Sequence, residues 1–122
     1  MEEKKVLVVD DEENITIAIS DLFELAKFKV FKALSAEDAL KIFERGKPQI
    51  AIIDVHMPFS EFDGIELLRR IKNIDKTTRC VMITRIDDKE KIDEAKKLGV
   101  EEYLIKPISL EEVKTLIEKL KK

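Results

Sequence analysis

The sequence contains few of the residues that build crosslinked, metal-thiolate or glycine-rich sites. It has one cysteine, three glycines, three prolines, one tyrosine and no tryptophan. A single cysteine excludes a disulfide framework and a structural zinc site, and Cys80, which lies in an apolar stretch, is expected to be a small buried hydrophobe. No glycine fingerprint follows the first apolar stretch, so the chain lacks the loop that nucleotide and flavin binders place there.

An excess of charge of one sign and long apolar runs are also missing. Lys and Arg number 23 against 26 Asp and Glu, a net charge of −3, so direct binding to nucleic acid or to an acidic membrane is not expected. No run approaches the roughly 18 apolar residues of a membrane span, and the start MEEKK has the wrong charges for a signal peptide, so we expect a cytoplasmic protein. The 122 residues, 44% of them hydrophobic, predict one domain (1–122) with a packed core.

Five short apolar stretches alternate with longer segments of helical periodicity. This alternation predicts an α/β fold with a doubly wound, five-stranded parallel sheet in the flavodoxin-like order 2-1-3-4-5 and helices on both faces. The second stretch carries Lys29 and Lys32 and is expected at an edge of the sheet, whereas the first, third and fourth are almost wholly apolar, as central strands are. The stretches are KVLVVD (5–10), KVFKAL (29–34), QIAIID (49–54), RCVMIT (79–84) and EEYLIK (101–106).

Apolar residues recur at helical spacing between these stretches and predict the core-facing sides of the helices. Ser109 and Glu112 form a capping box at the start of the last helix. The segment 88–98 offers few residues for burial, among them Ile92 and Ala95, so this fourth helix is expected to be the least firmly packed. The remaining stripes are Ile15, Ile19, Leu22 and Ala26; Ala36, Ala39, Leu40 and Phe43; Ile65, Leu68 and Ile71; and Val113, Leu116, Ile117 and Leu120.

Acidic residues lie at the ends of two predicted central strands. Asp10 and Asp11 follow the first and Asp54 ends the third, and the carboxyl ends of these strands meet where the winding of the sheet reverses. Two unit charges about 4 Å apart repel by roughly 4 kcal/mol at an effective dielectric constant near 20. Either one acid is protonated, or a hard divalent ion with oxygen ligands neutralises the group; we predict the ion, Mg²⁺, with Mn²⁺ as a substitute.

The fourth and fifth strands contribute two further polar side chains at the same edge. Thr84 supplies a hydroxyl, and Lys106, just before Pro107, supplies an ammonium group. A carboxylate, a metal ion, a hydroxyl and an ammonium together meet the needs of a phosphoryl group in transfer, namely a nucleophile, charge neutralisation and donors for its oxygens. A carboxylate with an ordinary pKa is ionised at neutral pH and needs no separate base, so we predict Asp54 as the phosphoacceptor.

At these residues the chain resembles the receiver domains of two-component response regulators. The resemblance covers nearly the whole chain and consists of VVDDEEN, IIDVHMP, DGIELL, MIT and EYLIKP in the right order and spacing. It implies that Asp54 accepts a phosphoryl group from a phosphohistidine of a sensor histidine kinase or phosphotransfer protein. It also implies that the metal is bound by Asp10, Asp11, Asp54 and the backbone carbonyl of His56. Lys106 would pair with the phosphoryl oxygens, and the Lys106–Pro107 peptide would be cis. Thr84 and Tyr103 would act as the switch.

The resemblance further implies how a signal leaves the domain. The face built from the fourth helix, fifth strand and fifth helix would change on phosphorylation and bind a downstream output domain or protein, or a second copy of the chain as a phosphorylation-dependent homodimer. The chain would be a signalling phosphoacceptor rather than an enzyme with its own substrate, catalysing its own Mg²⁺-dependent phosphoryl transfer and slow autodephosphorylation.

Two features depart from the family pattern. Arg85 follows Thr84 where a small residue is usual, which puts a cation at the mouth of the pocket and leaves the phosphoryl lifetime open. The stretch MPFSEFDG has two residues more than the commonest form, and Phe59 and Phe62 in this longer loop are expected either to contact a partner or to fold back onto the domain. Both departures leave an alternative function, a receiver-like interaction module that is not phosphorylated.

Several of these residues also have a purely structural interpretation. Asp10 alone could be an acid stabilised by a helix N-terminus, as Glu12 and Glu13 are expected to be. His56 is expected to contribute only its backbone. Asp54 is harder to explain structurally, because a carboxylate at the end of a buried strand needs a partner.

Overall fold

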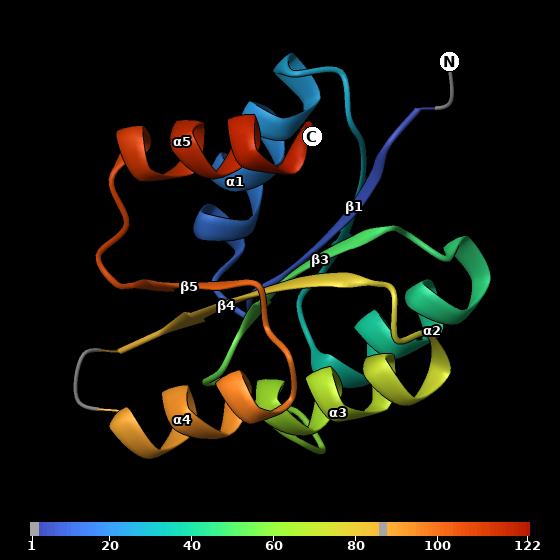
Figure 1. Ribbon diagram of the computed structural model, residues 1–122, viewed down its shortest axis with the longest axis vertical. Helices are drawn as coiled ribbons and strands as arrows, with labels where there is room; N and C mark the ends of the chain where they lie inside the picture. The colour runs from blue at the N-terminus through green and yellow to red at the C-terminus, as the bar shows by residue number, and fades with distance from the viewer. Residues whose placement is uncertain (1–2, 86–87) are drawn as a thin grey trace.

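Five strands form one parallel sheet with helices on both faces (Figure 1). The computed structural model describes residues 3–85 and 88–122. The strand order β2-β1-β3-β4-β5 confirms the predicted flavodoxin-like α/β fold and puts β2 at an edge. The elements are β1 (Lys5–Val9), α1 (Glu13–Leu25), β2 (Lys29–Ala33), α2 (Ala36–Gly46), β3 (Ile50–Asp54), α3 (Gly64–Ile74), β4 (Arg79–Thr84), α4 (Lys89–Lys97), β5 (Glu102–Ile105) and α5 (Leu110–Leu120).

The register of the central strands decides which residues meet at the carboxyl edge of the sheet. Val9 of β1 is aligned with Ile53 of β3, so the residues that follow them, Asp10 and Asp54, come next to each other. On the other side of β3, Asp54 is aligned with Ile83 of β4. The acids therefore lie between the first and third strands, at the reversal of the winding.

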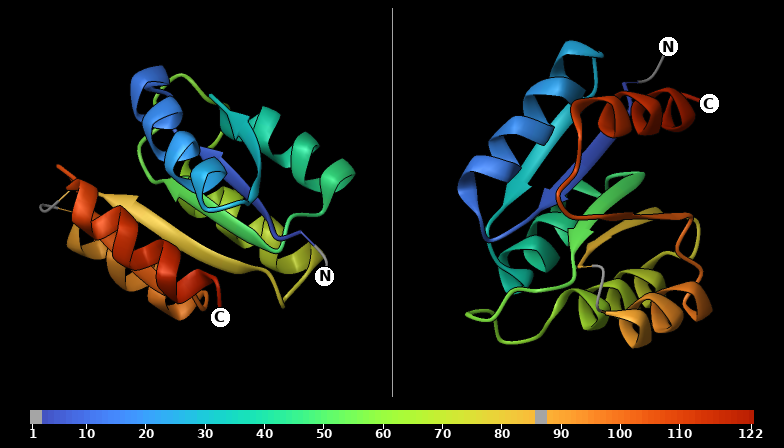
Figure 2. Two further views of the ribbon diagram at one scale, coloured as in Figure 1. Left: turned by 90° about the horizontal axis from the view of Figure 1, so that it is seen from above. Right: turned by 90° about the vertical axis from the view of Figure 1, so that its left-hand side faces the viewer.

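The sheet lies between two layers of helices (Figure 2). It separates two apolar cores. Side chains alternate along a strand, so Leu7 and Val9 face the core under α2, α3 and α4, while Val6 and Val8 face the core under α1 and α5. Burial on both faces explains why the central strands are apolar at nearly every position. Cys80 is fully buried in the first of these cores, as predicted.

Side-chain caps begin α2, α3 and α5, whereas α1 and α4 begin without one. Ser109 and Glu112 form the predicted capping box of α5, and the Ser35 hydroxyl accepts a hydrogen bond from an amide of α2. Asp88, at the start of α4, forms no such bond, and Ala95 is the one buried residue of that helix. Among the described residues no helix is long and apolar enough to cross a membrane.

Helix α1 packs on the sheet with the predicted stripe at one side of the contact, and only Ile19 of that stripe is buried. The Thr16 hydroxyl donates to the backbone carbonyl of Asp10 at 2.8 Å, and Phe23 packs edge-on against Phe28 with 5.1 Å between ring centroids. These contacts turn the predicted stripe partly away from the sheet, so that Ile15 and Leu22 are only half-buried. The buried residues of α1 are Thr16, Ile19, Ser20 and Phe23.

Candidate functional site

Three strand ends bring oppositely charged side chains together in one crevice. The Nζ of Lys106, after β5, donates to Oδ2 of Asp54 at 3.3 Å and lies 3.4 Å from Oδ2 of Asp10. Both carboxylates are buried, with Asp10 0% and Asp54 1% exposed. The lysine side chain is 20% exposed and so connects the buried acids with the surface.

Backbone amides hold one oxygen of each buried acid. The N–H of Glu12 donates to Oδ1 of Asp10 at 2.9 Å, and the N–H of His56 donates to Oδ1 of Asp54 at 3.3 Å. The second oxygen of each acid points to Lys106. Oδ2 of Asp10 has no hydrogen-bond partner among the described residues, although it lies near the ammonium group. A buried carboxylate oxygen without a hydrogen bond is costly, which suits an oxygen that binds a cation.

Burial is the main cause of the shifted pKa values in this cluster. Burial raises the pKa of Asp54 to about 7, the negative charge of Asp10 adds to this, and Lys106 acts against it. Burial likewise raises the pKa of Asp10 above its ordinary value. For Lys106, burial acts to lower the pKa, but the charges of Asp54 and Asp10 and the hydrogen bond to Glu12 outweigh it and the pKa is raised. The crevice therefore holds three carboxyl groups around one ammonium group, that of Lys106.

The acids at the end of β1 fit a hard divalent cation. Carboxylate oxygens of Asp10, Asp11 and Glu12 lie within 4.8 Å of one another. The donors are all oxygens, and one of them is buried without a hydrogen bond. A cation would also favour the ionised forms of Asp10 and Asp54, whose pKa values are raised mainly by burial. Asp54 is not in this group of three, and its Oδ2 accepts a hydrogen bond from Lys106.

Glu12 has a role at the site that the sequence interpretation missed. It was expected to be only an acid near a helix start, yet its Oε1 lies 3.1 Å from Nζ of Lys106. The signal in the sequence is its position, because Glu12 occupies the N-cap of α1, where Glu is not among the preferred residues, directly after Asp10 and Asp11.

Gly64 allows α3 to begin against the end of the acceptor strand. A Cβ at this position would lie 2.1 Å from the backbone oxygen of Asp54, and the Gly64 N–H donates to the carbonyl of Val55 at 3.0 Å. The sequence interpretation gave Gly64 no structural role. The close approach explains why a glycine stands at the first position of this helix.

The two phenylalanines of the long loop before α3 behave differently. Phe59 is 95% exposed. Phe62 packs onto the core, with the Arg70 guanidinium 4.0 Å from its ring centroid. The loop is also tied to α2, since the Ser60 hydroxyl accepts from the N–H of Ala36 at 3.0 Å. Phe62 therefore folds back, whereas Phe59 remains at the surface.

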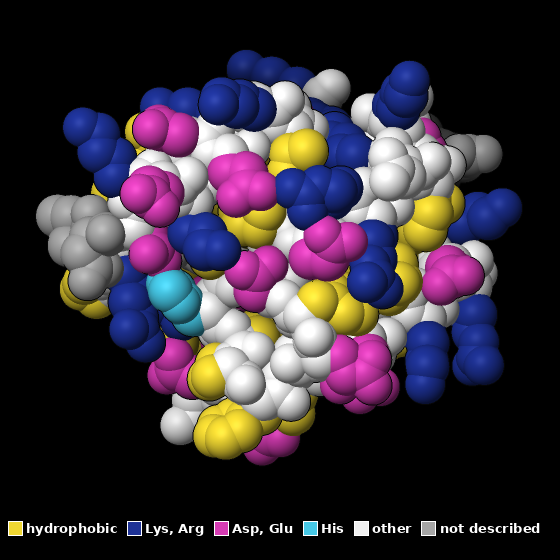
Figure 3. All heavy atoms as spheres, turned by 90° about the horizontal axis from the view of Figure 1, so that it is seen from below, with side chains coloured by type: hydrophobic (Ala, Val, Ile, Leu, Met, Phe, Trp, Pro, Cys, Tyr) yellow, Lys and Arg dark blue, Asp and Glu magenta, His cyan; other side chains and the backbone are white. Residues whose placement is uncertain are grey.

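Ionic contacts join this loop and α3 to α4. The ring of His56, which was expected to contribute only its backbone, contacts the carboxylate of Asp88. Lys91 of α4 pairs with Asp63 at 2.9 Å, and α3 and α4 are linked directly by Arg69 and Glu94 at 2.7 Å. Figure 3 shows this underside of the molecule, where acidic and basic side chains alternate around the histidine.

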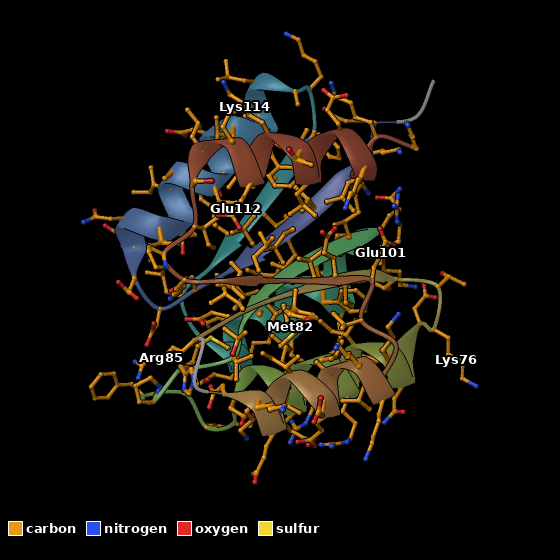
Figure 4. The ribbon with its side chains drawn as sticks, turned by 60° about the vertical axis from the view of Figure 1, so that its left-hand side comes forward. Lys76, Met82, Arg85, Glu101, Glu112 and Lys114 are labelled. Carbon is orange, nitrogen blue, oxygen red and sulfur yellow. The ribbon has the colours of Figure 1, made fainter. Side chains whose placement is uncertain are left out.

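The remaining predicted features are Thr84, Tyr103 and the Lys106–Pro107 peptide. Thr84 is 1% exposed, and its Oγ1 lies 3.5 Å from the backbone oxygen of Arg85. Arg85 follows β4 at its carboxyl end and is exposed (Figure 4). Tyr103 is half-buried, with the Lys96 ammonium 5.0 Å from its ring centroid. The Lys106–Pro107 peptide bond is cis, as the resemblance implies.

Comparisons with known proteins agree with this arrangement. A family model described as the response regulator receiver domain matches residues 6–118. Sporulation initiation phosphotransferase F of Bacillus subtilis is 31% identical over 98% of this chain and 94% of its own length. A CheY-like receiver domain structure from Methanospirillum hungatei has a TM-score of 0.88 at 25% identity, covering 98% of this chain and 92% of that one. A receiver domain structure from Clostridium thermocellum has a TM-score of 0.83 at 31% identity, covering 97% of each chain.

Some relatives are much longer than the matched region. The regulatory protein AtoC of Escherichia coli is 30% identical over 94% of this chain, but only 24% of its own length is covered. The likeness to that protein concerns this one region.

The class of the protein is defined by a doubly wound α/β sheet that has an acidic crevice at the reversal of its winding and a lysine across it. The chain belongs to the response regulator receiver domain family. Receiver domains are the phosphoacceptors of two-component systems and have no enzyme role of their own. The membership supports phosphorylation-dependent signalling, with a histidine kinase or phosphotransfer protein as partner.

Proposed function

We propose that Asp54 is the phosphoacceptor of a single receiver unit spanning 1–122. The observation that supports this most strongly is the hydrogen bond of its buried carboxylate with Lys106 at 3.3 Å. Beside it lies Oδ2 of Asp10, which has no hydrogen bond among the described residues. Lys106 is close enough to follow a charge that moves from the carboxylate onto phosphoryl oxygens. Thr84, buried at the end of the neighbouring strand, is proposed as a second donor to those oxygens.

The proposed reaction is a direct displacement at phosphorus. An oxygen of ionised Asp54 attacks the phosphorus of a phosphohistidine, and an O–P bond forms as the P–N bond breaks. The electron pair of that bond stays on the imidazole nitrogen of the donor, which takes up a proton from solvent if it leaves as an anion. Since the pKa of Asp54 is raised to about 7, a cation in the crevice would increase the ionised fraction that can attack.

Mg²⁺, or Mn²⁺ in its place, would supply charge neutralisation for the transferred group. We propose that Asp10, Asp11 and Asp54 and the backbone carbonyl of His56 hold it. The amides that fix Oδ1 of Asp10 and of Asp54 leave the other oxygen of each acid for a cation or for Lys106.

An apolar groove beside the crevice is a suitable docking place for the phosphodonor protein. It has a volume of about 660 Å³, and its rim includes Glu12 and Lys106, which also belong to the crevice. A donor whose phosphohistidine reaches Asp54 would therefore cover it. Its apolar lining comes from α1, the segment after β5, and α5: Ile15, Ala18, Leu22, Ile108, Leu110 and Val113.

We propose the face of α4, β5 and α5 as the output surface. Tyr103 of β5 lies half-buried under the Lys96 ammonium of α4, so a rotation of its ring would change this surface. A movement of Thr84 toward the phosphoryl group would leave space for that rotation. The surface would bind an output domain or protein, or a second copy of the chain.

The alternative is an interaction module that is never phosphorylated. The exposed Phe59 and the exposed Arg85 favour it, since both offer contacts that do not depend on phosphate. The two functions differ in one result. Beryllofluoride with Mg²⁺ would change the affinity of a switch for its output partner and would leave that of a constant module unchanged.

Phosphorylation by a small donor tests the proposal directly. With acetyl phosphate and Mg²⁺, the protein should gain the mass of one phosphoryl group, and a chelator should prevent the gain. Asp54→Asn should abolish it, whereas Asp93→Asn, at an exposed position of α4, should not. Unchanged mass in the unsubstituted protein, or equal gain by Asp54→Asn, would refute Asp54 as the acceptor.

A further inference from the structure

Glu12 makes the shortest of three contacts to Lys106. Nζ lies 3.1 Å from Oε1 of Glu12, 3.3 Å from Asp54 and 3.4 Å from Asp10. The ammonium group donates hydrogen bonds to Glu12 and Asp54, while Oδ2 of Asp10 lies near it without a hydrogen bond. A phosphoryl oxygen that approaches Lys106 therefore meets other anions at the same ammonium group.

The three carboxylates differ in how readily they can leave. Asp10 and Asp54 are buried, and a backbone amide holds one oxygen of each. The side chain of Glu12 is 62% exposed and can turn into solvent. Of the three carboxylates, Glu12 is therefore the one that can most easily give up its contact with Lys106.

The Glu12 side chain has no helix-capping role that would explain its position. It occupies the N-cap of α1 without a side-chain capping hydrogen bond. The bond that Glu12 gives to Asp10 comes from its backbone N–H and does not depend on the side chain. The carboxylate can thus be neutralised while the amide that holds Asp10 stays in place.

We propose that the Glu12 carboxylate is an internal competitor of the phosphoryl group for Lys106 and so limits how readily Asp54 takes up and keeps that group. This inference rests on the proposed phosphoacceptor role of Asp54. Two effects act in the same direction: Glu12 occupies a donor of the ammonium group, and its negative charge repels an anionic phosphodonor.

The expected effect is moderate because Glu12 is largely exposed. Exposed ion pairs are screened by water, and removal of this charge should tighten binding of a phosphoryl-like anion roughly fivefold, the upper range for such pairs. Glu12→Gln is the test variant, since it keeps the length of the side chain. Glu13→Gln is the matched control, because it removes the same charge from the next residue, which is exposed in the first turn of α1.

Two measurements on the full chain test the proposal. The first is the apparent dissociation constant of beryllofluoride in saturating Mg²⁺, measured from the changes in amide chemical shifts. We expect about fivefold tighter binding in Glu12→Gln and less than a twofold change in Glu13→Gln. The second is the phosphorylation rate by mass spectrometry with two donors. Glu12→Gln should accelerate the reaction with doubly charged acetyl phosphate more than that with singly charged phosphoramidate, and the gain should shrink in about 1 M salt.

The possible outcomes separate this proposal from the proposed function. Equal effects of Glu12→Gln and Glu13→Gln would overturn the competition, since only the net charge would then matter. Weaker beryllofluoride binding in Glu12→Gln would overturn it too, because Glu12 would then assist binding. If all three proteins are phosphorylated at one rate, the competitor role fails while Asp54 remains the acceptor. If none reacts or binds beryllofluoride, the phosphoacceptor function itself fails.

Discussion

In metal-free buffer, replacement of Asp54 by Asn should stabilise the protein, and the gain should depend on pH. The pKa of Asp54 is raised from its ordinary value of 3.8 to about 7, mainly by burial and then by the charge of Asp10. An acid with a higher pKa in the folded chain holds its proton more tightly there than in the unfolded chain. Between the two pKa values the folded state therefore binds more protons, and stability falls as the pH rises.

The size of the effect follows from the two pKa values. A difference of about three pH units corresponds to roughly 4 kcal/mol, the largest destabilisation that ionised Asp54 can cause. Asn lacks the charge but also gives up the ionic contact with Lys106, which keeps Asp10 and Glu12 as partners. We therefore expect Asp54→Asn to raise the free energy of unfolding by about 2–4 kcal/mol at pH 8 and by almost nothing near pH 3.5.

Urea unfolding between pH 3.5 and pH 8 with a chelator present measures this difference. Asp21→Asn, at an exposed position of α1, is the control and should change stability little at any pH. Saturating Mg²⁺ should reduce the difference. It binds the ionised carboxylates of the folded, unsubstituted protein and stabilises that protein by mass action. A gain that is the same at both pH values, or a loss at pH 8, would refute the view that ionised Asp54 is the destabilising group.

Three further predictions concern the metal, the acceptor loop and its aromatic residues. Asp11→Ala should lower Mg²⁺ affinity at least about tenfold in a calorimetric titration, because it removes a carboxylate ligand; unchanged affinity would move the metal elsewhere. Gly64→Ala should lower the free energy of unfolding by about 2–3 kcal/mol in urea, because its Cβ would lie 2.1 Å from the Asp54 backbone oxygen; a neutral result would show that α3 shifts freely. Phe59→Ser should change stability by less than about 0.5 kcal/mol, whereas Phe62→Ala should cost about 1–2 kcal/mol; equal values would contradict the different burial of the two rings.

The fold followed from the sequence because local and long-range signals agreed. Apolar strands, helical stripes and the Ser109 capping box each predict the same alternation, and the strand order then brings Asp10 to Asp54. Residues at the ends of strands were predictable, since a parallel sheet brings its carboxyl ends to one edge. Lys106 belongs to this group.

Contacts that depend on side-chain direction could not be predicted. Glu12 was grouped with the acids of a helix start, and only its direction toward Lys106 distinguishes it from Glu13. The contact of the His56 ring with Asp88 joins two loops whose distance no local pattern encodes. The turn of α1 depends on a hydroxyl bond from Thr16, a residue that hydropathy alone assigns to the surface.

The attachment of α4 depends on the medium more than that of any element held by apolar packing. Ala95 is the one buried residue of this helix, while Lys91 and Glu94 pair with Asp63 and Arg69. Dissolved ions screen such pairs over about 8 Å at physiological ionic strength but leave the burial of an alanine almost unchanged. Salt should therefore loosen α4 while the sheet stays intact. A helix of the proposed output surface would then separate from the rest of the domain with a small input of free energy.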